Sequence, residues 1–173
     1  MTRLRTANLL GALSGEVSHR LDRQWRHHPS QTSSSAAALN VIGFWEGCSN
    51  NELASALRLS HTATVRLVDK LEADALVEVR PGRDRRAIAL HLTQAGEAEV
   101  RRLLTQRCAA LEEVTRALST EETQVFAGLL EKLLRAVTPG MQAATQICRL
   151  CDQTVCPEEI CPVHQAALAA DGA

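Results

Sequence analysis

The chain has 173 residues, of which 45% are hydrophobic and 23% charged, and its formal net charge is −1. This length suits one domain with its own core and leaves little room for a second. No run of residues approaches the roughly 18 apolar residues of a membrane-spanning helix, so the sequence excludes a membrane span.

The first 28 residues are predicted to form one amphipathic helix. They carry five Arg against two acidic residues, whereas residues 93–173 carry seven basic and eleven acidic residues. Apolar side chains recur every three or four positions, at Leu9, Leu10, Leu13, Val17, Leu21 and Trp25. This repeat runs past the apolar segment of a cleavable signal peptide, so we expect the helix in the mature protein and a cytoplasmic location.

Residues 27–35 contain a proline followed by several hydroxyl residues, a pattern that ends one helix and caps another. A second helix is expected over about 36–45. Ser49 and Glu52 then form the Ser-x-x-Glu pattern of a capping box, which opens a short helix that ends near Leu57.

Ser60 is placed to cap a further helix that runs to about Ala73. Two β-prone runs, 76–80 and 87–92, follow it on either side of the turn PGRDRR and predict a hairpin with a charged tip. Helix, turn, helix and charged hairpin is the order of a winged helix-turn-helix, which we assign to residues 36–92.

The helix after Ser60 is the candidate DNA-reading element, because a recognition helix buries one face and offers the other to the major groove. Helical periodicity assigns Thr64, Leu67, Val68, Leu71 and Ala75 to the inward face. The candidate DNA-contacting residues are Ser60, His61, Thr62, Arg66 and Lys70. Arg66 and Thr62 are the best base or phosphate readers, whereas Ser60 and His61 lie where a helix N-terminus meets phosphate.

The hairpin tip carries Arg83, Asp84, Arg85 and Arg86. Arginines on a thin protrusion suit the minor groove, and Asp84 is placed to orient one of them through an ion pair. The alternative is an ordinary solvated turn, because a charge cluster alone is common.

Two long helices are predicted over residues 93–140. Thr93 is expected to cap the first, and Ser119 with Glu122 forms a second capping box. Both helices carry apolar stripes that are wider than one small winged domain can cover. We therefore expect a second copy of the chain to cover them, with residues 1–28 and 93–140 as the dimerisation arm.

The segment from Asn50 to Glu97 resembles the winged helix-turn-helix of the MarR family of bacterial transcription regulators. Its most specific pieces are RLVDKLE, the DRR of the hairpin and LTQAGE, and the resemblance extends to about residue 140. It implies a mainly α fold with a two-stranded wing and no enzymatic activity. It further implies a homodimer that binds a palindromic operator in double-stranded DNA, usually as a repressor, and an aromatic small-molecule inducer. Ala75 and Val65 depart from the family pattern, which commonly has Gly and a hydroxyl residue there. The resemblance implies that Ala75 tolerates a tight turn and that Val65 lacks one expected hydroxyl contact with DNA.

Residues 146–165 form a cysteine-rich segment that the family pattern does not include. Its candidate ligands follow the spacing C-x2-C-x4-C-x4-C-x2-H and are Cys148, Cys151, Cys156, Cys161 and His164. Zinc takes four ligands, so we expect the four cysteines to bind zinc and His164 to be in reserve. An iron–sulfur cluster, a metal-free thiol switch and an incidental disordered tail are the alternatives.

The remaining cysteines and the tryptophans are expected to be structural. Cys108 continues an apolar helix stripe and Cys48 precedes a capping box, so both are predicted to be packed or solvated thiols. Trp25 and Trp45 are expected in the core. The sequence thus predicts a MarR-like repressor whose operator binding responds to metal or redox state at residues 148–164. The alternatives are a regulator of the same type that responds to an organic ligand and has a structural zinc tail, and a metal or redox protein that does not bind DNA.

Overall fold

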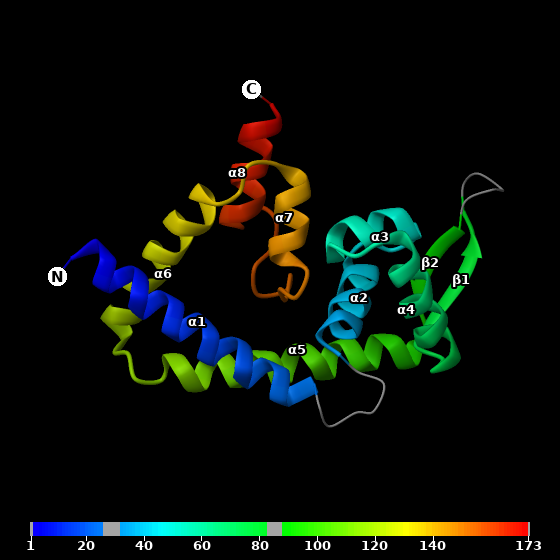
Figure 1. Ribbon diagram of the computed structural model, residues 1–173, viewed down its shortest axis with the longest axis horizontal. Helices are drawn as coiled ribbons and strands as arrows, with labels where there is room; N and C mark the ends of the chain where they lie inside the picture. The colour runs from blue at the N-terminus through cyan, green and yellow to red at the C-terminus, as the bar shows by residue number, and fades with distance from the viewer. Residues whose placement is uncertain (1, 26–31, 83–87, 173) are drawn as a thin grey trace.

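A computed structural model describes residues 2–25, 32–82 and 88–172 of the chain (Figure 1). Its helices and strands, in chain order, are α1 (Arg3–Trp25), α2 (Ser33–Phe44), α3 (Asn50–Leu57), α4 (His61–Ala73), β1 (Val77–Pro81), β2 (Ile88–Leu92), α5 (Gln94–Thr115), α6 (Thr120–Ala136), α7 (Met141–Cys148) and α8 (Pro162–Asp171). The predicted fold class, mainly α with a two-stranded wing, is confirmed. None of the described helices has the length and apolar character that crossing a membrane requires.

The winged helix-turn-helix lies at one end of the molecule, where α2, α3 and α4 pack beside the hairpin of β1 and β2 (Figure 1). The strands are antiparallel, in a register that pairs Val77 with Leu92 and Pro81 with Ile88. Helix α2 forms the centre of this domain, and its side chains from Ser35 to Ile42 are all buried. A helix that is apolar and buried all round occupies the middle of a core.

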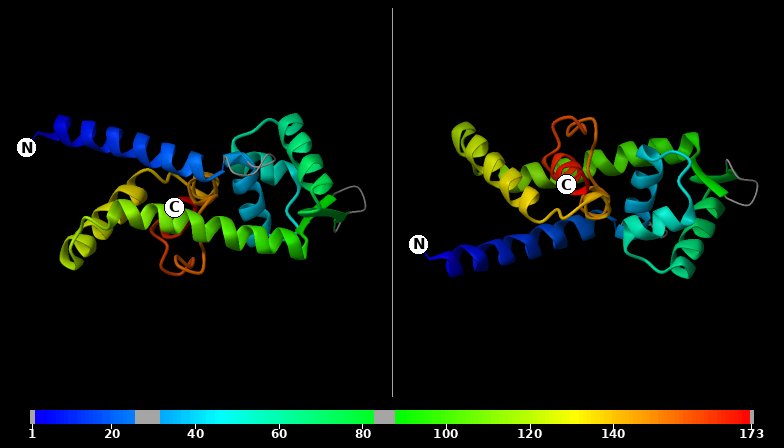
Figure 2. Two further views of the ribbon diagram at one scale, coloured as in Figure 1. Left: turned by 90° about the horizontal axis from the view of Figure 1, so that it is seen from below. Right: turned by 90° about the horizontal axis from the view of Figure 1, so that it is seen from above.

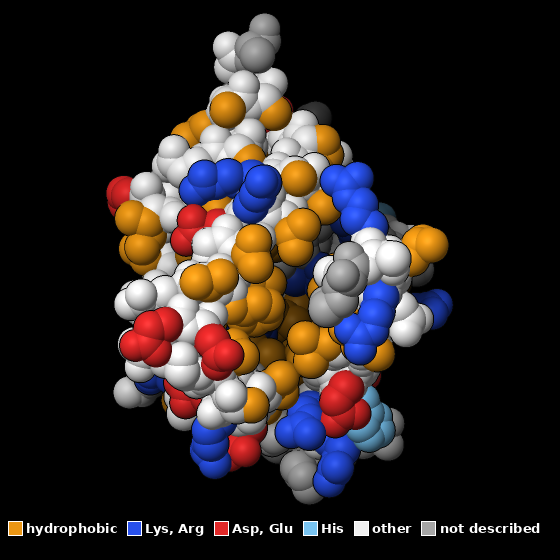
Figure 3. Space-filling view, turned by 90° about the vertical axis from the view of Figure 1, so that its left-hand side faces the viewer, with side chains coloured by type: hydrophobic (Ala, Val, Ile, Leu, Met, Phe, Trp, Pro, Cys, Tyr) orange, Lys and Arg blue, Asp and Glu red, His pale blue; other side chains and the backbone are white. Residues whose placement is uncertain are grey.

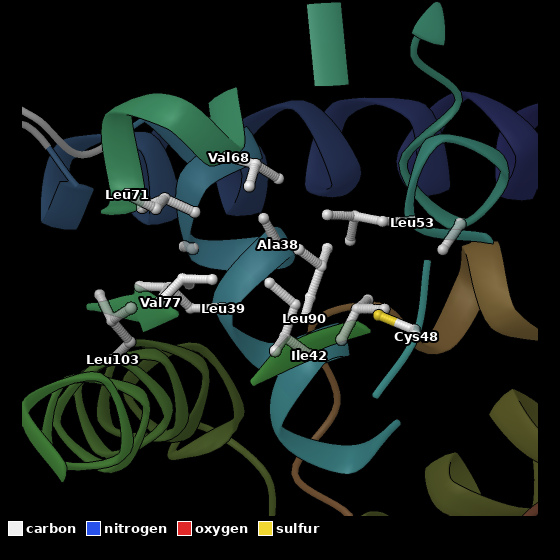
Figure 4. Packing of buried hydrophobic residues seen from close by; sticks show 13 residues of the cluster. Ala38, Leu39, Ile42, Cys48, Leu53, Val68, Leu71, Val77, Leu90 and Leu103 are labelled. Atoms are coloured by element: carbon white, nitrogen blue, oxygen red, sulfur yellow. The ribbon is translucent and has the colours of Figure 1, made fainter. Parts of the chain in front are cut away.

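The core of this domain is built from large aliphatic side chains that different elements contribute (Figure 4). Those with no appreciable exposure are Leu39 and Ile42 of α2, Leu53 of α3, Leu71 of α4 and Leu90 of β2. Leu103 of α5 joins the same cluster and fastens the long helix to the winged domain.

The predicted helix starts are confirmed by their hydrogen bonds. Both Ser-x-x-Glu patterns are complete capping boxes, in which Ser49 pairs with Glu52 and Ser119 with Glu122. The side chain of Thr93 caps α5 and accepts a hydrogen bond from the backbone of Gly96, 3.0 Å away. Each of these caps joins residues three positions apart, which is why sequence alone predicts them.

Contrary to the prediction from helical periodicity, Ala75 does not belong to the inward face of α4, but it does occupy the tight turn that was expected at this position. The helix ends at Ala73, and Ala75 is exposed with a φ of 56°, in the left-handed region. The turn is closed by Thr93, whose Oγ1 donates to the carbonyl of Ala75 at 2.7 Å. An alanine thus occupies a conformation that glycine adopts at lower cost.

Gly96→Ala is expected to destabilise this junction between the wing and α5. A Cβ at position 96 would lie 2.0 Å from the carbonyl oxygen of Leu76, so backbone would have to move. We expect the free energy of unfolding to fall by at least about 2 kcal/mol, measured by urea denaturation. Gly128→Ala is the matched control, because its Cβ meets nothing within 4 Å. It should raise stability by about 0.5–1 kcal/mol, and equal effects of the two substitutions would contradict the expected clash.

The helices α1, α5 and α6 extend from the winged domain as an arm, with α1 packed along α5 (Figure 2). Several large apolar residues on the arm are exposed: Leu4, Leu9, Leu10 and Leu13 of α1, Val125, Leu129, Leu130 and Leu133 of α6, and Val137 at its C-terminal cap. Figure 3 shows hydrophobic side chains gathered at the centre of this face, with charged groups toward its rim. The apolar stripe of α6 and the apolar residues near the N-terminus of α1 are therefore uncovered in a single chain, whereas the stripe of α5 is buried or half-buried.

Residues 141–172, which include the cysteine-rich segment, are folded and contain two helices that were not predicted from the sequence. Cys148 is the last residue of α7, and Cys161 immediately precedes α8, whose first residue is Pro162. The two helices pack together, and the backbone amide of Met141 donates to Asp171 at 3.0 Å. An incidental disordered tail is therefore the wrong description of residues 141–172.

Trp45 is not a core residue, contrary to the prediction. It is the C-cap of α2 and its side chain is 40% exposed. It lines a surface hollow between α3 and α7, together with Ser55 and Met141. The apolar pattern of α2 does not predict that Trp45 is exposed, because Trp45 lies one residue beyond the end of the helix. The side chain of Trp25 lies outside the described part of the chain.

Candidate nucleic-acid interface and metal centre

Helix α4 has the two faces that the sequence predicts. Thr64, Val68 and Leu71 are buried against the winged domain. The candidate DNA-contacting residues Ser60, His61, Thr62, Arg66 and Lys70 are all exposed. Arginine is able to chelate a guanine edge, and Arg66 is unobstructed in the middle of this exposed face. The geometry is that of a recognition helix, whereas the DNA contacts themselves remain predictions.

The N-terminus of α4 is held in place by local hydrogen bonds. Ser60 Oγ accepts from the backbone amide of Ala63 at 3.2 Å, so this hydroxyl caps the helix. The ring Nδ1 of His61 lies 2.8 Å from Oδ1 of Asn51 on α3. This bond fixes His61 relative to the preceding helix and leaves its other ring nitrogen exposed beside a helix N-terminus, where phosphate oxygens bind.

The candidate wing contacts, Arg83, Asp84, Arg85 and Arg86, lie outside the described residues. The strands that carry them are in place, and Arg80 on β1 forms an exposed ion pair with Glu78. The assignment of the hairpin tip to DNA therefore stays a prediction from sequence.

The five candidate metal ligands lie together. Cys148, Cys151, Cys156, Cys161 and His164 all line one cavity of about 110 Å³ between α7, α8 and the segment that joins them. This volume is far below the roughly 300–1,000 Å³ of typical small-molecule pockets. The cavity therefore suits an ion or a small cluster better than an organic effector.

The four thiols in this cavity interact with one another. The thiol of Cys148 is a neighbour of those of Cys151 and Cys161, and the thiol of Cys156 is a neighbour of that of Cys161. The interaction with Cys148 and the nearby guanidinium of Arg107 lower the pKa of Cys151 to about 6, although burial opposes them. The interaction with Cys151 raises the pKa of Cys148, and burial raises the pKa of Cys156 to about 11. Cys151 is thus the thiol that most readily becomes a thiolate.

His164 has a different partner from the cysteines. Its side chain is 24% exposed, and Nε2 lies 3.8 Å from a carboxylate oxygen of Glu158. The cavity therefore contains four interacting sulfurs and one imidazole directed to a carboxylate. That His164 is the spare ligand remains a prediction.

All six cysteines are free thiols. Within residues 2–25, 32–82 and 88–172, no three His, Cys, Asp or Glu side chains already have an arrangement that could hold a metal ion. Zinc, iron–sulfur and thiol-switch chemistry at these residues all remain predictions.

The two other cysteines are structural, as expected. Cys48 is buried in the core of the winged domain, and burial raises its pKa to about 12. A buried thiol with a raised pKa is a poor nucleophile and a poor metal ligand. Cys108 is partly buried on α5.

The residues that join the cysteine-rich segment to the winged domain were not predicted from the sequence. Asn40 of α2 donates from Nδ2 to the carbonyls of Arg149, at 3.1 Å, and Cys151, at 3.0 Å. Gln142 and Gln146 of α7 donate to Ser55 of α3 at 3.1 and 3.0 Å. The only signal in the sequence that could have suggested these contacts is Asn40 itself, because a polar residue within an apolar helix usually needs a hydrogen-bond partner.

Comparison with known proteins gives a consistent result for the winged domain. A model of the MarR family matches residues 32–87. The uncharacterized HTH-type transcriptional regulator YsmB of Bacillus subtilis (strain 168) is 31% identical over 83 residues, which are 47% of this chain and 57% of that protein. The match thus spans little more than half of the length of this relative.

Solved structures resemble most of the chain. A MarR family protein from Bacillus stearothermophilus is 26% identical with a TM-score of 0.67, covering 80% of this chain and 99% of that one. Streptococcus pneumoniae FabT in complex with DNA has a TM-score of 0.68 at 20% identity, covering 79% of this chain and 97% of that one. At 20% identity the likeness to FabT concerns the fold alone.

Proposed function

Because its winged helix-turn-helix belongs to the MarR family, we propose that this protein is a transcription regulator that binds double-stranded DNA through α4. The observation that carries this proposal is the two-sided character of α4, buried at Thr64, Val68 and Leu71 and exposed at Arg66 and its polar neighbours. An exposed face of this kind on a well-anchored helix suits the major groove.

The regulator is proposed to act as a homodimer and as a repressor. The apolar residues exposed on α1 and α6 support a second copy of the chain as the partner of the arm. A two-fold dimer presents two α4 helices, so its operator is expected to be palindromic.

The operator affinity is proposed to respond to the state of the cysteines that line the small cavity. The alternative input is an organic ligand, with zinc only stabilising the tail. A larger hollow of about 340 Å³ favours this alternative, since it lies between α2 and α5 and is bordered by residues 151–154. Chelation of metal should release DNA in the first case and leave the DNA complex intact in the second.

The primary test is a gel-shift titration of the full-length protein with its own upstream DNA. If a dimer contacts about 6–10 phosphates, its affinity should fall on the order of 10³–10⁵-fold between about 50 and 200 mM salt. Unrelated DNA of equal length is the control and should bind more weakly. A metal or redox protein that does not bind DNA would give no shift at low salt, and that result would refute the proposed function.

A further inference from the structure

We propose that Cys148, Cys151, Cys156 and Cys161 bind one zinc ion and that zinc binding stabilises the helix-turn-helix through Asn40. The consequence for operator binding rests on the proposed function. Zinc binding and its effect on the winged domain can be measured without DNA.

The four cysteines line one cavity of about 110 Å³, a volume that suits a single ion. Cys148 is a neighbour of Cys151 and of Cys161, and Cys156 is a neighbour of Cys161. With a Zn–S bond of about 2.3 Å, tetrahedral geometry separates ligand sulfurs by about 3.8 Å, so these neighbouring thiols hold one ion once their side chains turn toward it. An iron–sulfur cluster needs its cysteine sulfurs further apart, since the cluster itself lies between them.

Zinc binding forms four Zn–S bonds in place of the four S–H bonds. The thiol protons leave to solvent and the side chains turn toward a common centre. His164 stays with Glu158, whose carboxylate lies 3.8 Å from its ring nitrogen. No oxidation or reduction takes place in this step.

A zinc ion with four thiolates is formally dianionic, and the chain provides a cation beside it. Arg107 of α5 lies close enough to Cys151 to affect the charge on its sulfur. The Nε of Arg107 is buried and has no hydrogen-bond partner among the described residues. A buried guanidinium nitrogen without a partner is costly unless negative charge develops nearby, which zinc binding supplies.

Asn40 joins the proposed site to the winged domain. Its side chain is 6% exposed, and its amide donates to the carbonyls of Arg149 and Cys151. Arg149 directly follows the ligand Cys148, and Cys151 is itself a ligand. Leu150, between these two residues, packs against the core of the winged domain. The Cys148–Cys151 turn is therefore bonded to α2 by both polar and apolar contacts.

Helix α7 provides a second contact, with the turn of the helix-turn-helix. Gln146 donates to the carbonyl of Ser55 and accepts from Nε of Arg58 at 2.7 Å. Arg58 is the C-cap of α3 and has a left-handed φ of 55°. Because Cys148 ends α7, an ion held by Cys148 restrains the helix that contacts this turn. A ligand that binds only the folded arrangement stabilises every element coupled to it.

The test compares full-length protein loaded with Zn²⁺ and protein treated with a chelator under reducing conditions. Elemental analysis should give one zinc per chain, with no iron in protein purified without oxygen. Zinc should slow amide hydrogen exchange in α2 and α3 as well as in residues 141–172. Cys148→Ser with Cys151→Ser should abolish both effects, whereas Cys108→Ser, the matched control outside the cavity, should change neither.

Asn40→Ala and Gln146→Ala separate zinc binding from its effect on the winged domain. Asn40→Ala should weaken zinc binding roughly 10- to 100-fold, as loss of a partner that orients a ligand does. At saturating zinc it should also lose the protection of α2. Gln146→Ala, at a more exposed position, should keep zinc affinity and lose protection in α3. It serves as the second variant if Asn40→Ala does not fold.

Bound iron or absence of zinc would overturn the proposed site. Zinc-dependent protection confined to residues 141–172 would overturn the coupling. If zinc protects α2 and α3 but neither form binds DNA, the proposed function fails and the coupled zinc site stands. If both forms bind the operator equally while the protection is present, the regulatory consequence alone is refuted.

Discussion

Arg66→Ala is expected to abolish specific binding to the operator. Arg66 is exposed on the face of α4 opposite the buried Thr64, Val68 and Leu71. Loss of a bidentate contact to guanine costs about 1–3 kcal/mol, and a dimer loses it twice, so affinity should fall by about 30-fold to 2 × 10⁴-fold. Fluorescence anisotropy with operator and unrelated DNA would measure both the affinity for the operator and the preference for it over unrelated DNA.

The matched control is Arg116→Ala. Arg116 is the C-cap of α5, at the far end of the arm from the winged domain, and forms an exposed ion pair with Glu113 at 2.7 Å. Its loss should leave operator affinity nearly unchanged. If Arg66→Ala reduces binding to unrelated DNA as much as to the operator, Arg66 contacts phosphate and does not read a base.

Leu129→Glu combined with Leu133→Glu is expected to prevent the proposed dimer from forming. Both leucines belong to α6, with 54% and 51% of their side chains exposed in the single chain. Full burial of a leucine contributes about 1.5–3 kcal/mol and about half of each side chain is still exposed, so two substitutions in each of two subunits remove about 3–6 kcal/mol before the cost of burying carboxylates. Sedimentation equilibrium should show a monomer, and specific DNA binding should be lost with it.

Gln124→Glu is the control for this pair of substitutions. Gln124 is exposed on the same helix, on the side opposite the apolar residues, and its replacement likewise introduces a carboxylate. It should leave the dimer intact. A double variant that remains dimeric would show that α6 does not form the interface.

Features that depend on residues close in sequence were predictable. The capping boxes at Ser49 and Ser119 and the cap at Thr93 need only partners three positions away, and all three are present. The two faces of α4 follow from helical periodicity, which places Val68 and Leu71 inward. Close spacing along the chain is likewise enough to group the four cysteines with His164, and all five line one cavity.

Predictions failed where a helix ended or a short helix had a weak pattern. Helical periodicity continued through Ala75, but the chain leaves the helix at Ala73, so Ala75 turns outward. Trp45 is apolar but lies just past the end of α2. The eight residues of α7 are too few for a clear periodic signal, and their contact with α3 is what gives them a place in the fold.

The winged helix-turn-helix, the exposed face of α4 and the group of candidate ligands could be predicted from the amino-acid sequence, because each depends on periodicity, capping or spacing over a few residues. How these parts are joined became clear only from the packing of the folded chain. Asn40 reaches carbonyls 109 and 111 positions away, and Arg58 meets a glutamine 88 positions away. Contacts at such separation leave no local pattern, since they depend on how the helices pack. They connect the cysteine-rich segment to the helix-turn-helix.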